Sequence, residues 1–249
     1  ISSILDLDAL LGKVAHMIHT QLNYPFVHIF LLDRVQNTIE FHSGSGSRAK
    51  KYRENKVSFD LEAPKGLIPL TVRRNKTHIS GDVRHDPEYQ NCPIIGAQSG
   101  SELTIPLAFN QEVFGVLDVQ SAQTNAFDEA DISLLTTLSA SISIAIRNAK
   151  LYNAEKWRSR VAESLQSVAR KLTDGSTLEE KFDFILECIS AILPCDAAAI
   201  WLLDETSLQS GESPACLRLT AHKSHLTANH THLDNCLSGE LTWYSEALT

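Results

Sequence analysis

The chain has 249 residues, a formal net charge of −8 and an isoelectric point near 5.7. Such an acidic balance argues against a nucleic-acid partner, which needs a basic face to meet the phosphates. At about 150 residues per domain, the length suits one and a half domains. The sequence shows no uninterrupted apolar run of about 18 residues and no signal segment before the first helix, so we expect a cytoplasmic fragment without a membrane span.

The cysteines indicate neither a disulfide framework nor a redox pair. Their number is odd and no two are spaced as Cys-x-x-Cys, so reduced thiols are expected at Cys92, Cys188, Cys195, Cys216 and Cys236. Residues 216–236 also contain four histidines, but their spacing fits no established zinc pattern. No metal site is predicted.

The chain begins with an expected helix over 7–22, capped by Asp6 and carrying one apolar stripe. A strand over 26–32 and a second over 38–42 then form an antiparallel hairpin. Strict alternation places His28 and Phe30 on one face of this hairpin, while Val27, Ile29 and Leu31 face the other way. Residues 44–47 are interpreted as a loose loop.

The middle of the domain alternates short elements with one long connection. We expect a strand over 57–61, a short helix over 66–74 and a strand over 77–80. Residues 81–100 show little periodicity and form a long irregular loop, of a kind that often carries function. A second hairpin follows, with strands over 102–109 and 112–120 around Asn110-Gln111.

A long helix then starts at Asp128, whose carboxylate caps it. Apolar residues recur at three- and four-residue spacing up to Ala149, and no glycine or proline interrupts the chain before Gly175. Beyond Tyr152 the apolar stripe shifts phase, which is compatible with a twisted coiled coil. We expect a linker helix over 128–174 that seeks a partner helix.

The chain after Gly175 repeats its own beginning. Ser176-x-x-Glu179 is a candidate capping box, the helix over 178–193 resembles that over 7–22, and the strand over 197–204 resembles residues 26–33. Residues 176–249 are therefore interpreted as the first part of a second domain copy.

Six segments in this order resemble the GAF domain family: APKGLI, HISGDVRHDP, SELTIPL, GVLDVQS, FDEADISLL and IAIRNAKLY, which start at Ala63, His78, Ser101, Gly115, Phe127 and Ile144. The resemblance implies an α+β fold over 1–150, with an antiparallel sheet of about six strands, the terminal helices on one face and a ligand pocket on the other. It further implies the tandem GAF sensory region of a bacterial signalling protein, such as a sensor histidine kinase or a nucleotide cyclase, with the second GAF truncated.

The resemblance directs the strand face of His28 and Phe30 toward the pocket. The loop adds charged and aromatic groups and the second hairpin adds two polar ones, so the candidate ligand contacts are His28, Phe30, His78, Asp82, Arg84, Tyr89, Thr104 and Asp118. Each has a plainer interpretation. A lone strand histidine usually packs within a core, and the loop charges are equally consistent with a solvated turn. Asp118 would equally serve as a solvated edge charge.

The ligand itself stays unknown at this point. Cyclic-nucleotide pockets of the family carry Asn-Lys after the last strand and an Asp-Glu pair, whereas this chain has Ser121-Ala122 and follows Asp131 with Ile132. A bilin is disfavoured because no cysteine precedes a histidine, and haem has no positive support.

No catalytic constellation is recognisable, so no enzyme activity is expected in this fragment. A homodimer through helices 7–22 and 128–172 is predicted. The alternatives are a structural dimerising spacer without ligand, or a methionine sulfoxide reductase of the GAF type, although Cys92 would then lack a resolving partner in the first domain.

Overall fold

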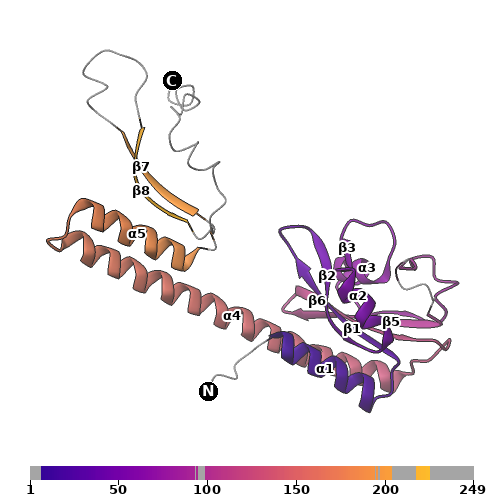
Figure 1. The fold of residues 1–249 in the computed structure, drawn as a ribbon. Coiled ribbons are helices and arrows are strands. Elements are labelled where there is room, and N and C mark those ends of the chain that lie inside the picture. Colours follow the sequence, from indigo (N-terminus) through magenta and orange to yellow (C-terminus); the bar gives the residue numbers. More distant parts are fainter. Residues whose placement is uncertain are drawn as a thin grey trace. The chain divides into compact units, whose positions relative to one another are not determined.

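The computed structural model describes residues 7–92, 94, 99–193, 195, 197–203 and 217–224. The chain divides into two compact units, residues 1–152 and 153–249 (Figure 1).

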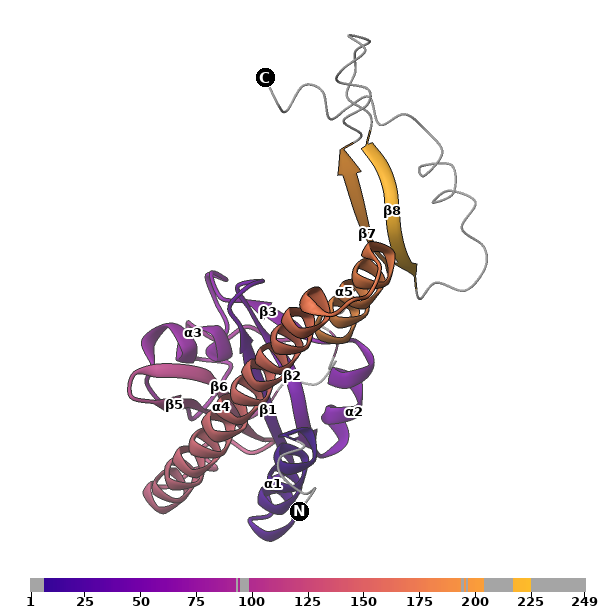
Figure 2. The same cartoon turned by 90° about the vertical axis from the view of Figure 1, so that its left-hand side faces the viewer.

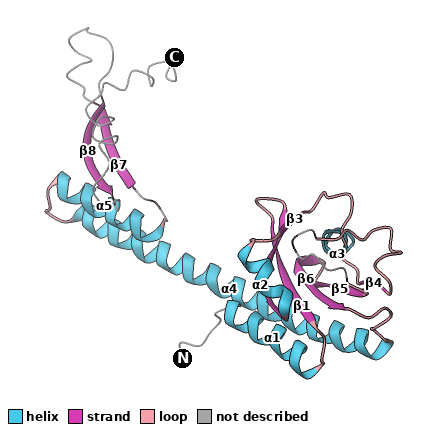
Figure 3. Ribbon diagram, turned by 45° about the vertical axis from the view of Figure 1, so that its right-hand side comes forward, coloured by secondary structure: helices cyan, strands magenta, loops and turns pink. Residues whose placement is uncertain are grey.

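One antiparallel sheet of six strands organises the first unit, in the spatial order β3-β2-β1-β6-β5-β4 (Figure 3). Every neighbouring pair in this sheet is antiparallel. The strands are β1 (Phe26–Asp33), β2 (Thr38–Ser45), β3 (Ser58–Asp60), β4 (His78–Ser80), β5 (Ser101–Phe109) and β6 (Glu112–Ser121). The predicted α+β class and its six-stranded sheet are confirmed.

The terminal helices cover one face of this sheet. α1 (Leu7–Gln21) and the first part of α4 (Glu129–Thr173) run side by side beneath it (Figures 1 and 2). Their apolar stripes share one core with the sheet, and its fully buried members include Leu11, Ile18, Ile29, Leu103, Leu117, Leu135 and Ile146. Burying these side chains stabilises the sheet-on-helix arrangement, at roughly 1.5–3 kcal/mol for each large residue.

The opposite face carries two short helices, α2 (Ser47–Glu54) and α3 (Leu67–Arg74). A second, smaller apolar cluster forms here, made of Phe30, Ile39, Tyr52, Val57, Ile68 and Val116. Val27 and Ile29 instead belong to the core under α1 and α4. The alternation predicted for β1 is therefore confirmed.

The prediction of a loop at 44–47 is wrong, because β2 continues to Ser45 and α2 starts at Ser47. The helix sequence SRAKKYRE has no regular apolar stripe, so periodicity does not reveal it. Gly46 precedes the helix at φ 95°, and a Cβ atom there would lie 2.1 Å from the carbonyl oxygen of Pro25. Only glycine suits this corner.

The start of α4 is held by the predicted cap. The backbone N–H of Asp131 donates to Oδ1 of Asp128 at 2.9 Å, and the N–H of Asp128 donates to Oδ2 of Asp131 at 3.0 Å. The two carboxylates thus satisfy each other's backbone donors, as in a capping box. The cap expected at Asp6 lies outside the described residues.

By length and composition alone, α4 contains a window apolar enough to cross a membrane, contrary to the expectation from the sequence. Leu135, Ile142 and Ile146 of this helix are buried against the sheet. A core helix passes the same test, so the finding is weak support for a span.

The second unit contains α5 (Leu178–Ile192), β7 (Ala197–Leu203) and β8 (Leu217–Ser224), and the two strands pair antiparallel. The capping box lies one residue later than predicted: Thr177 accepts from the N–H of Glu180, whose carboxylate accepts from the N–H of Thr177. The helix and first strand expected here are confirmed, whereas most of residues 216–236 lie outside the described residues.

Candidate functional site

The register of the sheet arranges polar residues in two rows that cross the strands. Residues directly opposite one another from β1 to β4 form the first row: His28, Asp118, Thr104 and His78. The second row lies two residues along each strand, on the same face: Phe26, Gln120, Glu102 and Ser80. Four of the predicted site residues therefore fall in a single row.

A buried histidine–carboxylate pair forms the β1 end of the first row. His28 Nδ1 lies 2.9 Å from Asp118 Oδ2, and both side chains are fully buried. Gln120 Nε2 donates to the same carboxylate oxygen at 2.7 Å. Among the described residues, His28 Nε2 and Asp118 Oδ1 have no hydrogen-bond partner. The ring of Tyr52, from α2, stands edge-on to His28 at 4.6 Å between centroids and covers this pair.

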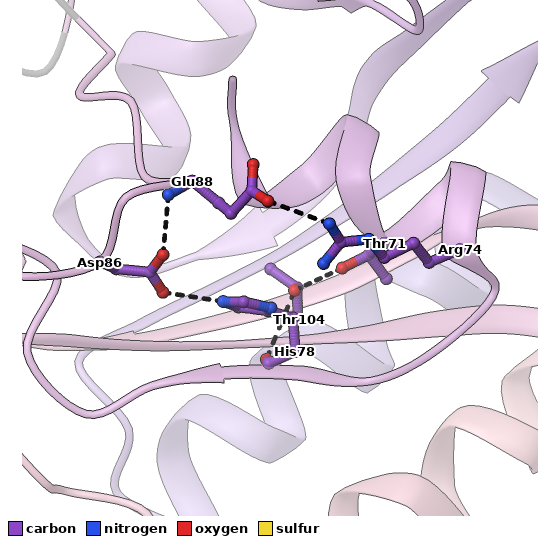
Figure 4. A network of polar contacts seen from close by, with 6 residues as sticks. All are labelled: Thr71, Arg74, His78, Asp86, Glu88 and Thr104. Atoms are coloured by element: carbon purple, nitrogen blue, oxygen red, sulfur yellow. Dashed lines mark hydrogen bonds and ion pairs between the residues drawn. The ribbon is translucent and has the colours of Figure 1, made fainter. Parts of the chain in front are cut away.

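The other end of the first row belongs to a network that anchors the loop after β4 (Figure 4). Thr71 and Thr104 share a hydrogen bond of 2.6 Å, and His78 Nε2 lies 2.8 Å from Asp86 Oδ2. Burial alone would raise the pKa of Asp86, but hydrogen bonds from His78, the backbone of Glu88 and Ser80 outweigh it and lower that pKa. The loop is thereby tied to the sheet.

The same loop is also tied to α3. Arg74 donates to Oε1 of Glu88 at 2.9 Å, as Figure 4 shows, and the carbonyl of Glu88 accepts from the N–H of Gly66. These contacts fix the segment that follows, whose Tyr89, Gln90, Asn91 and Cys92 line a cavity.

This cavity encloses about 500 Å³ on the face that carries α2 and α3. Glu102 and Gln120 of the second row form its floor together with Arg48 of α2. Its walls combine apolar and aromatic side chains with polar ones. The former include Tyr52, Phe59, Leu67, Ile68 and Tyr89, and the latter include Asn55, Ser58, Asp60, Gln90 and Asn91. A concave, mostly apolar space with a few convergent polar groups is typical of a small-molecule site.

Gln120 connects the cavity floor to the buried pair. Its Oε1 accepts from Arg48 at 2.5 Å and from Ser99 Oγ at 2.9 Å, while its Nε2 donates to Asp118. Arg48 also donates to Ser99 Oγ at 2.7 Å, and its guanidinium lies 3.9 Å above the ring of Phe26. The amide orientation of Gln120 is thus set by a donor on one side and an acceptor on the other.

Glu102 is the buried acid of this floor, with 4% of its surface exposed. Burial raises its pKa well above the ordinary value, the negative charge of Asp118 adds to the rise, and Arg48 opposes it. Burial, followed by the charge of Glu102, raises the pKa of Tyr89 to about 12. The floor therefore favours a protonated Glu102 in the empty cavity.

The structure separates the predicted site residues into three groups. Tyr89 lines the cavity. The fully buried His28, Phe30, Thr104 and Asp118 lie among the sheet residues and are absent from the cavity lining.

Three further predicted residues also lie outside the lining, near the start of the loop, where each is paired. His78 contacts Asp86, and Asp82 accepts from Arg84 Nε at 2.8 Å and from Arg84 Nη2 at 2.6 Å. The Arg84 hydrogen bonds hold the pKa of Asp82 below its ordinary range. Their expected role in ligand contact stays a prediction.

Sequence reasoning missed Arg48, Tyr52, Glu102 and Gln120. The first two lie on the helix that periodicity did not reveal. The other two had a usable signal, because Glu102 and Gln120 are polar residues within largely apolar stretches of β5 and β6. Within the described part of the chain, no group of three or more metal-ligating side chains was found.

The family model for the GAF domain matches residues 5–147, and the chain belongs to the GAF domain family. It is similar to GAF domain-containing protein A of Dictyostelium discoideum, with 28% identity over 51% of this chain and 73% of that protein. It is also similar to the sensor histidine kinase YhcY of Bacillus subtilis, with 27% identity over 65% of this chain. The match spans about half, 54%, of the kinase.

Solved structures share the fold. The GAF domain of a phosphoenolpyruvate-protein phosphotransferase from Coxiella burnetii has a TM-score of 0.55 at 22% identity, covering 61% of this chain and 89% of its own. A free methionine-R-sulfoxide reductase from Neisseria meningitidis, in complex with its substrate, has a TM-score of 0.51 at 21% identity, covering 59% and 81%. The membership indicates a sensory or regulatory role, in agreement with the kinase relative.

Proposed function

We propose that the first domain binds a small molecule in the 500 Å³ cavity and that the chain is the sensory part of a cytoplasmic signalling protein. The observation that carries this is the cavity itself, with aromatic walls and the polar floor of Arg48, Glu102 and Gln120. The similarity to a sensor histidine kinase supports a regulatory output, supplied by a further part of the protein.

The path from cavity to output starts at the floor. Gln120 is the penultimate residue of β6, and α4 begins only a few residues later, at Glu129. Ligand contact with the floor would therefore act on the strand that leads directly into the long helix. Such a change would bias α4 because its first part packs on the same sheet.

We further propose that the chain dimerises through α4, with α1 beside it. Four exposed residues of α4 recur at multiples of seven: Ile144, Leu151, Leu165 and Leu172, each about half exposed. Heptad spacing of apolar residues is the pattern by which one helix packs along a second copy. In the second unit, the order helix, strand, strand repeats the start of the first, which supports a partial second GAF domain there.

A thermal-shift screen of the full chain with nucleotides, amino acids, oxyacids and amines tests ligand binding. A bound compound at 100 times its dissociation constant adds roughly 2.7 kcal/mol to the free energy of unfolding, so Tm rises by several degrees. The variant Ala63→Trp, which fills the cavity from its wall, should lose the shift. If no compound shifts Tm, the result favours a structural spacer over a sensor.

One observation favours a second function. Cys92 is a free thiol that lines the cavity, and one structural neighbour is a free methionine-R-sulfoxide reductase. The sequence has no second cysteine before Cys188 to resolve an oxidised Cys92. Reduction of free methionine sulfoxide with dithiothreitol, lost in Cys92→Ser, would support this activity, and no turnover would reject it.

A further inference from the structure

The cavity floor presents a buried acid to a space lined by aromatic and apolar side chains and by polar side chains. Glu102 contributes to the lining, although 96% of its surface is covered when the cavity is empty. Behind it, Asp118 is fully buried, and its Oδ1 has no hydrogen-bond partner among the described residues. A buried carboxylate without its full set of donors is costly, so this floor is short of positive charge and of hydrogen-bond donors.

The basic groups near the cavity do not supply the missing charge. Arg48 is already engaged with Gln120 and Ser99 and is stacked on Phe26. Lys56 and Lys65 belong to the lining, but both are exposed to solvent. A solvated lysine gains little by reaching a buried carboxyl, because it must first lose its water.

The groups around Glu102 come from every element that packs against it. Asp118 and Asp86 add negative charge and Arg48 adds positive charge. Further titratable side chains lie nearby: His28 and His78 in the first row, Tyr52 on α2, and Tyr89 and Cys92 on the loop. The direct charges are thus two acids and one base, which leaves the neighbourhood of Glu102 negative once it ionises.

We infer that the cavity takes a ligand with a cationic nitrogen, an ammonium or amidinium group, which pairs with Glu102 at the floor. This inference rests on the proposed function and names the chemical class of its ligand. When Glu102 is protonated, its O–H proton passes to water as the cation binds; the cation then donates hydrogen bonds to the Glu102 carboxylate, and no other covalent bond changes. Charge-assisted hydrogen bonds of this kind are about twice as strong as neutral ones. The aromatic residues Tyr52, Tyr89 and Phe59 in the lining also favour a cation over an anion.

Three probes of similar size and different charge test the inference on the full chain: benzylammonium, benzyl alcohol and benzoate. Two-dimensional NMR titration follows the cavity residues for each probe. We expect benzylammonium to bind at least about tenfold more tightly than benzyl alcohol at pH 8, which corresponds to about 1.4 kcal/mol. Its affinity should fall about tenfold for each pH unit below the pKa of Glu102, because the proton competes with the cation.

Two variants test whether the Glu102 carboxylate itself, and not the overall negative charge of the protein, selects a cationic ligand. Glu102→Gln keeps the shape of the side chain, and we expect it to abolish both the preference for benzylammonium and its pH dependence. Glu62→Gln removes an exposed carboxylate that lies outside the lining and should change neither. An unchanged amide spectrum outside the cavity verifies that each variant is folded.

Equal or tighter binding of benzyl alcohol or benzoate at the cavity would overturn the cation assignment while leaving the cavity a ligand site. Persistence of the preference in Glu102→Gln would overturn the role of that residue. Absence of benzylammonium binding at about 10 mM probe at pH 8 would also overturn the inference, since even weak fragments bind in the millimolar range. The proposed function fails separately, when the thermal-shift screen yields no binder of any charge.

Discussion

His28 Nδ1 and Asp118 Oδ2 lie 2.9 Å apart, both side chains are fully buried, and Gln120 Nε2 donates to the same carboxylate oxygen. The pair connects β1 to β6 through side chains, directly behind the cavity floor. It therefore stabilises the fold and also sets the position of Gln120.

Replacing His28 with phenylalanine keeps a ring in the core but removes one of the hydrogen bonds to Asp118. Leaving a buried acceptor without its partner costs about 1–3 kcal/mol, so we expect the free energy of unfolding to fall by that amount in urea denaturation. The control is His85→Phe, whose side chain is 82% exposed, with an expected change within about 0.5 kcal/mol. Equal effects of the two substitutions would contradict a structural role for the pair.

We expect the free energy of unfolding to depend on pH because of the buried carboxyl of Glu102. Its pKa is higher in the folded than in the unfolded chain, because of burial and then the charge of Asp118. The resulting stability is fully present below the unfolded pKa and is lost as pH rises through the folded pKa. Each unit of difference corresponds to about 1.4 kcal/mol.

Glu102→Gln should remove this loss, so that its free energy of unfolding varies less between pH 5 and pH 8 than that of the unsubstituted chain. Denaturant titrations at several pH values measure it. Glu62→Gln, at an exposed position, serves as the matched control and should leave the slope unchanged. If the free energy of unfolding of Glu102→Gln varied with pH as much as that of the unsubstituted chain, a group other than Glu102 would cause the pH dependence.

Gly46 should tolerate no side chain, because its φ is 95° and a Cβ would meet the carbonyl oxygen of Pro25. Gly46→Ala is expected to cost about 1–3 kcal/mol. Gly12→Ala is the opposite control: it lies within α1 with no atom within 4 Å of an added Cβ, and should stabilise by about 0.5–1 kcal/mol. Thermal unfolding of both variants tests this: Gly46→Ala should lower Tm and Gly12→Ala should raise it.

The cap of α4 should contribute about 1 kcal/mol. Asp128→Ala removes the acceptor for the backbone N–H of Asp131, and the free energy of unfolding should fall accordingly. Asp128→Ser restores a capping oxygen and should recover most of the loss. If serine is no better than alanine, the carboxylate acts by another route than capping.

The proposed dimer predicts different effects for two exposed leucines of α4. Leu151→Glu lies in the heptad stripe and should weaken the dimer at least about tenfold in sedimentation equilibrium. Leu134→Glu is similarly exposed, at 44% against 55%, but lies outside the stripe and should leave the dimer intact. A wild-type chain that sediments as a monomer at micromolar concentration would contradict the proposal.

Local patterns in the sequence determined most of the helices and strands of the first domain. The period of α1 and α4, the alternation in β1 and the turn at Asn110-Gln111 all have local causes, namely side-chain spacing and turn chemistry. They were sufficient to predict the capped start of α4 and the face of β1 that carries Phe30, whereas the α+β class was implied by the resemblance to the GAF family. The helix α2 was not predicted, because tertiary contacts of Arg48 and Tyr52 stabilise it instead of an apolar stripe of its own.

The composition of the candidate site was decided by the tertiary structure. Asp118 and Gln120 are two residues apart in β6 and therefore share a face, but only the pairing register places Glu102 opposite Gln120 and Thr104 opposite Asp118. The helices α2 and α3 decide which of these side chains line the cavity, because they cover some of them. Tyr52 of α2 packs over His28, and Thr71 of α3 shares a hydrogen bond with Thr104. Glu102 is left at the cavity floor. Register and coverage arise from contacts between residues far apart in the chain, so spacing along the sequence carries no direct record of them.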